Sequence, residues 1–240
     1  MLNRLIVWIA ENDLQSEAYS ICGTIPLFIA GAYGLWYGHK IKMRAWKSFC
    51  VVELGSYAWG QFMNIVMWAN SGFREFGDRN VAVVFVYIPV IAWLLSKIFR
   101  ERYEAVSDQL AFTAMLMYGF GRWGCVFFGC CYGYPCSWGI YNPWKDAYLF
   151  PVAILESVIA LTLVGVLLYL SKKQNYKPTG RLLPILLTVY GILRFFIEFL
   201  HDNEKVLFGC SKLAFHALFM AIVGAILWMR KRKQQRRIVS

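Results

Sequence analysis

Four charged residues lie in stretches of sequence that are otherwise apolar enough to cross a membrane. They are Arg122, Glu156, Arg194 and Glu198. A charge near the bilayer centre costs roughly 2.5–3.5 kcal/mol on insertion scales, so such residues usually serve a function or pair with one another. The planar fork of arginine suits phosphate, which outer-leaflet phospholipids carry. The four residues therefore predict a site for a lipid headgroup.

Several of the polar residues recur at a helical spacing. Tyr190, Arg194 and Glu198 are four residues apart, and residues four apart share one face of a helix. His201 follows three residues after Glu198 and extends this polar stripe. One alternative stays open, in which Arg194 and Glu198 neutralise each other and only lock neighbouring helices together.

The elements that must position these residues are long apolar segments. Of the 240 residues, 59% are hydrophobic and 16% are charged, which is typical of a membrane protein with several spans. A helix needs about 20 apolar residues to cross the hydrocarbon core, whereas a membrane strand alternates over about ten. The runs are continuous, so the sequence predicts an all-α, polytopic protein, one domain over 1–240, with seven spans at approximately 19–38, 49–69, 81–99, 110–128, 151–170, 183–200 and 207–229.

The basic residues indicate how the spans are oriented. The net charge is +11, and 17 of the 25 Lys and Arg residues fall in the connections 39–48, 97–109 and 171–182 and in the tail 230–240. By the positive-inside rule the amino terminus then lies outside and the carboxyl terminus in the cytoplasm. The four intramembrane charges are thereby assigned to the outer leaflet. The tail could bind RNA, but basic residues directly after a last span more often anchor it against anionic lipid, so no nucleic-acid partner is expected.

Two further segments are expected at the outer surface. Residues 1–18 are too short and too often interrupted by acidic side chains to span, and they predict an interfacial helix, not a signal peptide. Residues 129–150 mix helix-breaking Gly and Pro with Tyr and Trp, and predict a cap over the outer face.

A glycine-rich segment surrounds the first arginine. Over residues 119–125 three glycines allow the backbone to approach another helix or a ligand closely. Residues 121–135, GRWGCVFFGCCYGYP, resemble the GRxGCFxxGCCYGxP motif of the prolipoprotein diacylglyceryl transferase family. Two further blocks follow in the family's order: residues 150–157, FPVAILES, are similar to its HPTQLYES block, and residues 190–201, YGILRFFIEFLH, to its YGxxRFxxEFxR block. Asp108 is similar to the family's aspartate before the fourth span.

This resemblance implies that a diacylglyceryl group is transferred from phosphatidylglycerol to the lipobox cysteine of a prolipoprotein. A thioether forms and glycerol phosphate is released, without cofactor or metal, in a multi-pass protein of the bacterial cytoplasmic membrane. In the implied mechanism Arg122 and Arg194 hold the lipid phosphate and stabilise charge that develops on it, and Glu198 orients Arg194. The substrate-binding positions that the resemblance implies are Tyr190, Glu156, Gly121, Gly124 and Cys125.

The sequence also departs from the family pattern. Residues 79–85 contain no histidine, although the family carries there a His-Gly-Gly motif proposed to help deprotonate the substrate thiol. Phe150 replaces a histidine, and His201 replaces an arginine. His201 is therefore a candidate for a substitute base, since imidazole exchanges protons near neutral pH, and the alternative is a solvated loop histidine. An active transferase or a lipid transferase with another acceptor is favoured over a binding protein without catalysis.

Seven cysteines raise the question of a metal or redox site. Cys125, Cys130, Cys131 and Cys136 lie within twelve residues, but neither a C-x-x-C pair nor a histidine accompanies them, so support for zinc is weak. Cys131 or Cys136 could form a disulfide on an oxidising outer face. Because the family motif itself contains the first three, packing of small side chains is the favoured interpretation.

Overall fold

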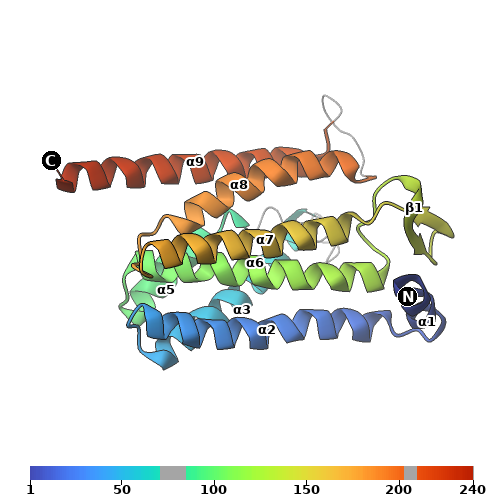
Figure 1. Ribbon diagram of the computed structural model, residues 1–240, viewed down its shortest axis with the longest axis horizontal. Coiled ribbons are helices and arrows are strands. Elements are labelled where there is room, and N and C mark those ends of the chain that lie inside the picture. The colour runs from blue at the N-terminus through green and yellow to red at the C-terminus, as the bar shows by residue number, and fades with distance from the viewer. Residues whose placement is uncertain (71–84, 203–209, 240) are drawn as a thin grey trace.

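The computed structural model of the chain describes residues 1–70, 85–202 and 210–239. Most of its long helices run side by side across the molecule (Figure 1). Apolar side chains pack between them. A helix suits these apolar runs because it satisfies its own backbone hydrogen bonds. In chain order the long helices are α2 (Gln15–Lys40), α3 (Ala45–Asn70), α5 (Ile88–Phe99), α6 (Tyr103–Phe128), α7 (Val152–Lys173), α8 (Leu182–Ile197) and α9 (Lys212–Val239).

Four of the described helices are long and apolar enough to cross a membrane. They are α2, α7, α9 over Lys212–Lys233, and α8 together with the short 3-10 turn η1 (Glu198–Leu200). The expected spans 49–69 and 110–128 lie within α3 and α6, which are each 26 residues long. The expected spans 81–99 and 207–229 begin in residues outside the described part of the chain. The protein is thus mostly helical, and several of its described helices have the length and apolar composition of membrane spans.

Helix α6 is the central element, because it packs against α2, α3, α5, α7 and α8. Two of its glycines allow close packing. A Cβ added to Gly119 would lie 2.9 Å from Leu161 Cδ2 of α7, and one added to Gly124 would lie 3.0 Å from Tyr19 Cδ2 of α2. The close approach expected at Gly121 is not found among the described residues, since no atom beyond its own stretch of helix lies within 4 Å of the position its Cβ would take. Two of the three glycines therefore bring α6 against its neighbours.

The segment 129–150, where the sequence predicts a cap without helix, contains two short strands. It forms an antiparallel hairpin of β1 (Pro135–Asn142) and β2 (Ala147–Leu149), a small addition of strand to a mostly helical chain. The Asn142 side chain makes the turn by accepting hydrogen bonds from the backbone N–H groups of Trp144 (3.0 Å) and Lys145 (3.1 Å). Tyr141 and Tyr148 form a cross-strand pair with ring centroids 5.4 Å apart.

The amino-terminal helix α1 (Leu2–Glu11) lies at the same end of the molecule as β1 (Figure 1). Its Ile6 and Ile9 are buried, whereas its Leu5 and Trp8 are exposed. Ile6 packs in a cluster with Val126 of α6 and Ala153 of α7. The expected interfacial helix over 1–18 is nevertheless shorter, because the chain turns after Glu11 and α2 begins at Gln15.

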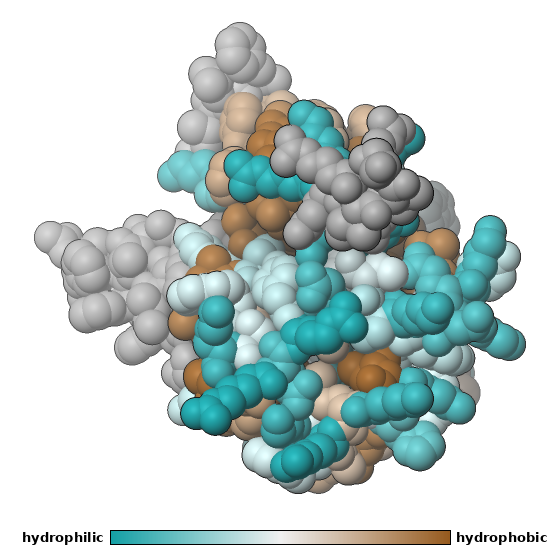
Figure 2. All heavy atoms as spheres, turned by 90° about the vertical axis from the view of Figure 1, so that its left-hand side faces the viewer, coloured by the Kyte–Doolittle hydropathy of each residue, from teal (hydrophilic) through white to brown (hydrophobic). Residues whose placement is uncertain are grey.

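The opposite end of the bundle carries the connections α2–α3, α5–α6 and α7–α8 and the end of α9 (Figure 1). Seen from that side, hydrophilic side chains spread over much of the described surface (Figure 2). The basic connections 39–48, 97–109 and 171–182, which are far apart in the sequence, therefore share one end of the protein.

A buried aspartate holds one of these connections in place. Asp108 of α6 is 1% exposed, and its carboxylate accepts hydrogen bonds from three backbone N–H groups that lead into α8: Thr179 (2.9 Å), Gly180 (2.9 Å) and Leu182 (3.0 Å). Backbone donors at a helix start need such acceptors because no preceding turn of helix supplies them.

Asp108→Ala is expected to destabilise the protein, because it leaves two buried N–H groups and one part-buried N–H group without their acceptor. The cost should be on the order of 3 kcal/mol. That cost corresponds to a melting temperature lowered by about 6–12 °C. Thermal unfolding in detergent would measure it, with Glu11→Ala at an exposed position as the control. An Asp108→Ala protein that melts with the control would show that the α7–α8 connection does not depend on this carboxylate.

Candidate functional site

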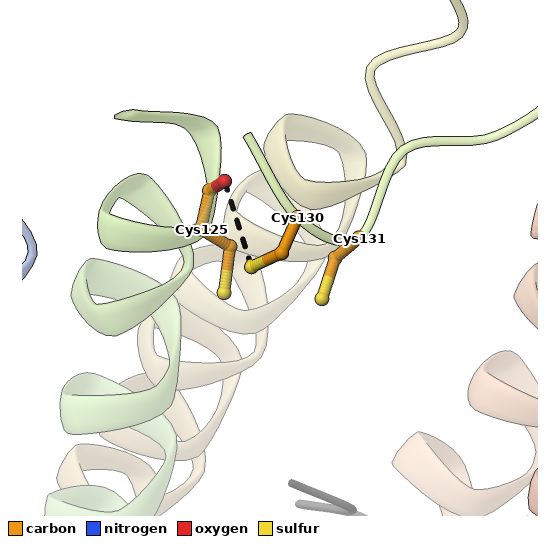
Figure 3. A group of neighbouring side chains, drawn as sticks. All are labelled: Cys125, Cys130 and Cys131. Atoms are coloured by element: carbon orange, nitrogen blue, oxygen red, sulfur yellow. Dashed lines mark hydrogen bonds between the residues drawn. The ribbon is translucent and has the colours of Figure 1, made fainter. Parts of the chain in front are cut away.

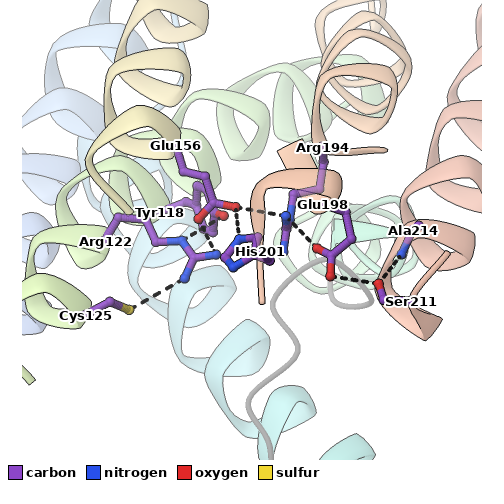
Figure 4. Close-up of polar contacts among 9 residues, drawn as sticks. All are labelled: Tyr118, Arg122, Cys125, Glu156, Arg194, Glu198, His201, Ser211 and Ala214. Atoms are coloured by element: carbon purple, nitrogen blue, oxygen red, sulfur yellow. Dashed lines mark hydrogen bonds and ion pairs between the residues drawn. The ribbon is translucent and has the colours of Figure 1, made fainter. Parts of the chain in front are cut away.

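The four intramembrane charges come together inside the bundle (Figure 4). Arg122 comes from α6, Glu156 from the first turns of α7, and Arg194 from the last turn of α8, while Glu198 begins η1. All four side chains are buried, and Glu156 is 0% exposed. Charges from three helices are thus removed from solvent at one place, so each must find its partners within the protein.

Glu156 is the centre of this cluster. One carboxylate oxygen, Oε2, forms an ion pair with Arg122 Nη2. The other, Oε1, lies 3.1 Å from Arg194 Nη1 and 3.5 Å from His201 Nε2. Figure 4 shows the carboxylate between the two guanidinium groups. A single buried carboxylate therefore holds both arginines and directs them toward each other.

The polar stripe expected on one helix is present. Arg194 Nη1 lies 2.8 Å from Glu198 Oε2, one turn away. Glu198 Oε1 also accepts a hydrogen bond of 2.7 Å from Ser211 Oγ, just before α9. Arg194 and Glu198 do pair, as the helix-locking alternative expects, but Arg194 also pairs with Glu156, so the two residues are part of a larger cluster.

Arg122 has further partners that fix its orientation. Its Nε donates a hydrogen bond of 2.9 Å to the Tyr118 hydroxyl, and its guanidinium carbon lies 5.0 Å from the centre of that ring. Its Nη1 lies 3.6 Å from Cys125 Sγ. The Tyr118 ring in turn packs edge-on against Tyr190, with centroids 5.4 Å apart, and both contact Phe85. Arg122 is therefore held on several sides.

His201 belongs to the site and is not a solvated loop residue. It is 5% exposed, and its ring reaches Glu156. Its backbone pairs with Gly133 in an antiparallel bridge, which ties the end of η1 to the segment before β1. A side chain at position 133 could not be accommodated, because a Cβ there would lie 2.3 Å from the Leu200 carbonyl oxygen.

Arg194 contacts both of its glutamates through one nitrogen. In the part of the chain that the structure describes, both of its ion pairs use Nη1, and its Nε and Nη2 groups make no hydrogen bond or ion pair. A guanidinium has five N–H donors arranged to match carboxylate or phosphate oxygens. Among the described residues, the two glutamates therefore hold Arg194 through Nη1 alone.

The sequence-predicted residues divide into those at the cluster and those beside it. Arg122, Glu156, Arg194, Glu198 and His201 form the cluster itself. The other expected binding positions lie beside the cluster. Cys125 contacts Arg122, and Tyr190 contacts Tyr118. Gly124 lets α6 pack against α2, and Gly121 has no described neighbour outside its own helix. Residues 79–84, where the family motif with histidine is expected, lie outside the described residues.

Two residues of the site were not predicted. Tyr118 lies four residues before Arg122, a spacing that places both on one helix face and could have indicated the contact. Ser211 gives no such signal, because its contact with Glu198 joins residues from different helices.

The chain resembles known proteins over most of its length. A family model described as prolipoprotein diacylglyceryl transferase matches residues 17–230. Phosphatidylglycerol–prolipoprotein diacylglyceryl transferase 2 of Clostridium perfringens is 32% identical over 166 residues, which is 65% of this chain and 64% of that protein. The phosphatidylglycerol–prolipoprotein diacylglyceryl transferase of Clostridium tetani is 32% identical over 138 residues, 53% of this chain and 54% of its own length. These matches span less than two thirds of the relatives. The chain belongs to the prolipoprotein diacylglyceryl transferase family.

Proposed function

We propose that the protein transfers the diacylglyceryl group of phosphatidylglycerol to the lipobox cysteine thiol of a prolipoprotein. The products are a thioether and glycerol phosphate. Family membership and the names of the relatives support this reaction. The observation that carries it is the convergence of Arg122 and Arg194 from two helices on the buried carboxylate of Glu156.

The proposed placement in the bacterial cytoplasmic membrane has seven spans, the amino terminus outside and the carboxyl terminus in the cytoplasm. Two observations support it: the basic connections share one end of the bundle, and the described apolar helices have the necessary length. The charged cluster then lies toward the outer leaflet, near the end that carries α1 and β1. Lipid headgroup and secreted peptide can both approach from that side.

The two arginines have the geometry to stabilise a departing phosphate. The Nε and Nη2 donors of Arg194 take phosphate oxygens, and Arg122 presents its guanidinium from the other side of Glu156. Donors fixed before the reaction stabilise developing charge without reorganising, and they act strongly in a site that excludes water. Glu156 and Glu198 set the positions of these donors, and His201 is the proposed acceptor of the thiol proton.

A second candidate is a lipid- or anion-binding protein without catalysis. The observation that favours it is the charge balance of the cluster, in which two arginines face two glutamates. Such a balanced cluster can hold helices together without any reaction. The two candidates differ in catalysis: the transferase modifies a lipobox peptide, and the binding protein leaves it unmodified.

The test uses the purified protein, phosphatidylglycerol and a synthetic lipobox peptide, and weighs the peptide by mass spectrometry. We expect a mass gain of one diacylglyceryl group on the cysteine peptide and no gain on a peptide with serine in place of the cysteine. The absence of any gain with phosphatidylglycerol or other phospholipids would exclude the transferase and favour the binding protein.

A further inference from the structure

Three thiols meet where α6 ends (Figure 3). Cys125 lies in the last turn of α6, and Cys130 and Cys131 lie in the turn that follows. Their Sγ atoms all lie within 4.8 Å of one another. Figure 3 shows the three side chains pointing into the same space.

The backbone explains why residues on both sides of a helix end face each other. The helix stops at Gly129, which adopts a left-handed conformation with φ 75°, and Cys131 adopts one with φ 61°. This conformation is rare for a residue other than glycine. The two left-handed residues turn the chain back over the end of α6, so that Cys130 and Cys131 return to Cys125.

The arrangement has the dimensions of a thiolate metal site. Zn–S bonds measure about 2.3 Å, so three thiolates around one zinc ion lie about 4 Å apart. The present separations of up to 4.8 Å need only small side-chain adjustments to reach that geometry. Thiolates select soft or borderline ions over Mg²⁺ and Ca²⁺.

Burial and charge also favour an ion here over packing alone. Cys125 is 9% exposed, whereas Cys130 and Cys131 are partly exposed, which leaves an entry path. Three thiolates with Zn²⁺ carry a net charge of −1. The Arg122 guanidinium, with Nη1 3.6 Å from Cys125 Sγ, offsets that charge.

We propose that Cys125, Cys130 and Cys131 bind Zn²⁺ through three thiolates and leave its fourth position open. Catalytic zinc sites commonly have three protein ligands and one exchangeable position, whereas structural sites have four. Among the residues that the structure describes, no further Cys, His, Asp or Glu completes this cluster as a fourth ligand. The open position is the natural place for an exogenous thiol.

The role of the site rests on the proposed transferase function. The acceptor thiol binds Zn²⁺ through sulfur and gives its proton to His201 or to water, because a coordinated thiol is deprotonated. The sulfur electron pair then attacks the carbon of the diacylglyceryl group that is bonded to the phosphate oxygen. A carbon–sulfur bond forms, the carbon–oxygen bond breaks, and its electron pair leaves with glycerol phosphate beside Arg122. Zinc would thus activate the nucleophile in a chain without the family's histidine motif.

Metal binding itself is tested on the full-length purified protein, stripped with a chelator and titrated with Zn²⁺. We expect one zinc ion per chain by elemental analysis, and a Co²⁺–thiolate charge-transfer band when Co²⁺ replaces it. Cys125→Ser, Cys130→Ser and Cys131→Ser should each lose the ion, whereas Cys136→Ser, in the neighbouring β1, should retain it.

A measurement on the unmodified chain covers the case in which a variant fails to fold. Bound Zn²⁺ should protect Cys125, Cys130 and Cys131 from alkylation and leave Cys136 reactive, as peptide mapping would show. Substoichiometric zinc, unprotected thiols or a disulfide among the three in the purified protein would each overturn the site.

The role in catalysis is tested separately by removing and restoring zinc. Transfer should fall by about 100-fold or more on chelation, the range of a lost proton-transfer catalyst, and return with Zn²⁺. Full activity of the zinc-free protein would overturn the role while the transferase function stands. A zinc-loaded protein without transfer would instead exclude the transferase function and leave the metal site in place.

Discussion

Replacing Arg194 with alanine is expected to lower the rate of diacylglyceryl transfer by about 10²–10³-fold, the loss typical of removing one preorganised donor. Arg194 lies between Glu156 and Glu198 and contacts both through Nη1. Its Nε and Nη2 groups have no partner among the described residues, so we expect them to bind the phosphate. The measurement is the rate of peptide mass gain from phosphatidylglycerol, with the variant confirmed to insert in the membrane.

A lysine in the same position separates catalysis from folding. Arg194→Lys keeps a positive charge for Glu156 and Glu198, but an ammonium lacks the planar fork that matches phosphate. We expect near-normal thermal stability and strongly reduced transfer. Arg181→Ala, at the other end of α8, is the matched control and should transfer at the normal rate. Undiminished transfer by both Arg194 variants would remove this residue from the site.

Replacing Glu156 with glutamine should cause the largest loss of stability among single substitutions at the site. The carboxylate is 0% exposed and contacts Arg122, Arg194 and His201, so its neutral amide would leave two buried guanidinium groups facing each other. Breaking a buried ion pair by removing one partner costs about 3–5 kcal/mol. Thermal unfolding in detergent would record this loss.

A partly exposed ion pair supplies the control for that substitution. Glu104 at the start of α6 lies 2.7 Å from Lys231 of α9, and these side chains are 29% and 20% exposed. Because exposed pairs contribute about 0–1 kcal/mol, Glu104→Gln should change the melting temperature little. If Glu156→Gln melted with Glu104→Gln, the cluster would not depend on its central carboxylate.

The parts of this fold that follow from local patterns could be predicted. The apolar runs indicate membrane-crossing helices, and the four-residue spacing of Tyr190, Arg194 and Glu198 correctly places them on one face. What could not be predicted is the role of Glu156, because its contacts join α7 to α6 and α8. A single sequence carries no direct signal for which helices meet.

Two further features depend on contacts that the sequence does not reveal. His201 has the polar neighbours of a loop residue, but pairing with Gly133 across the chain buries it. The Gly and Pro residues of 129–150 indicate a cap without indicating its hairpin, in which Tyr141 and Tyr148 flank a turn made by Asn142. In the first case the pairing of His201 with Gly133 determines burial, and in the second the pairing of β1 with β2 determines the hairpin.

The cysteines show how a spacing rule can miss a site. Zinc motifs are recognised by short regular intervals such as C-x-x-C, which hold within one loop. Here a helix end separates Cys125 from Cys130, and left-handed Gly129 and Cys131 bring the thiols together. The three thiols meet because the backbone turns back after α6, and the number of residues between the cysteines does not reveal this.

The central claim is that the carbon–oxygen bond between the diacylglyceryl group and the phosphate breaks, with the phosphate held by Arg122 and Arg194. The most direct measurement follows phosphatidylglycerol carrying one isotope in its diacylglyceryl glycerol and another in its headgroup glycerol. We predict that the first label appears in thioether linkage on the lipobox cysteine, and that the second leaves entirely as glycerol phosphate. Headgroup label on the peptide, or diacylglycerol released while the peptide stays unmodified, would contradict the proposed reaction.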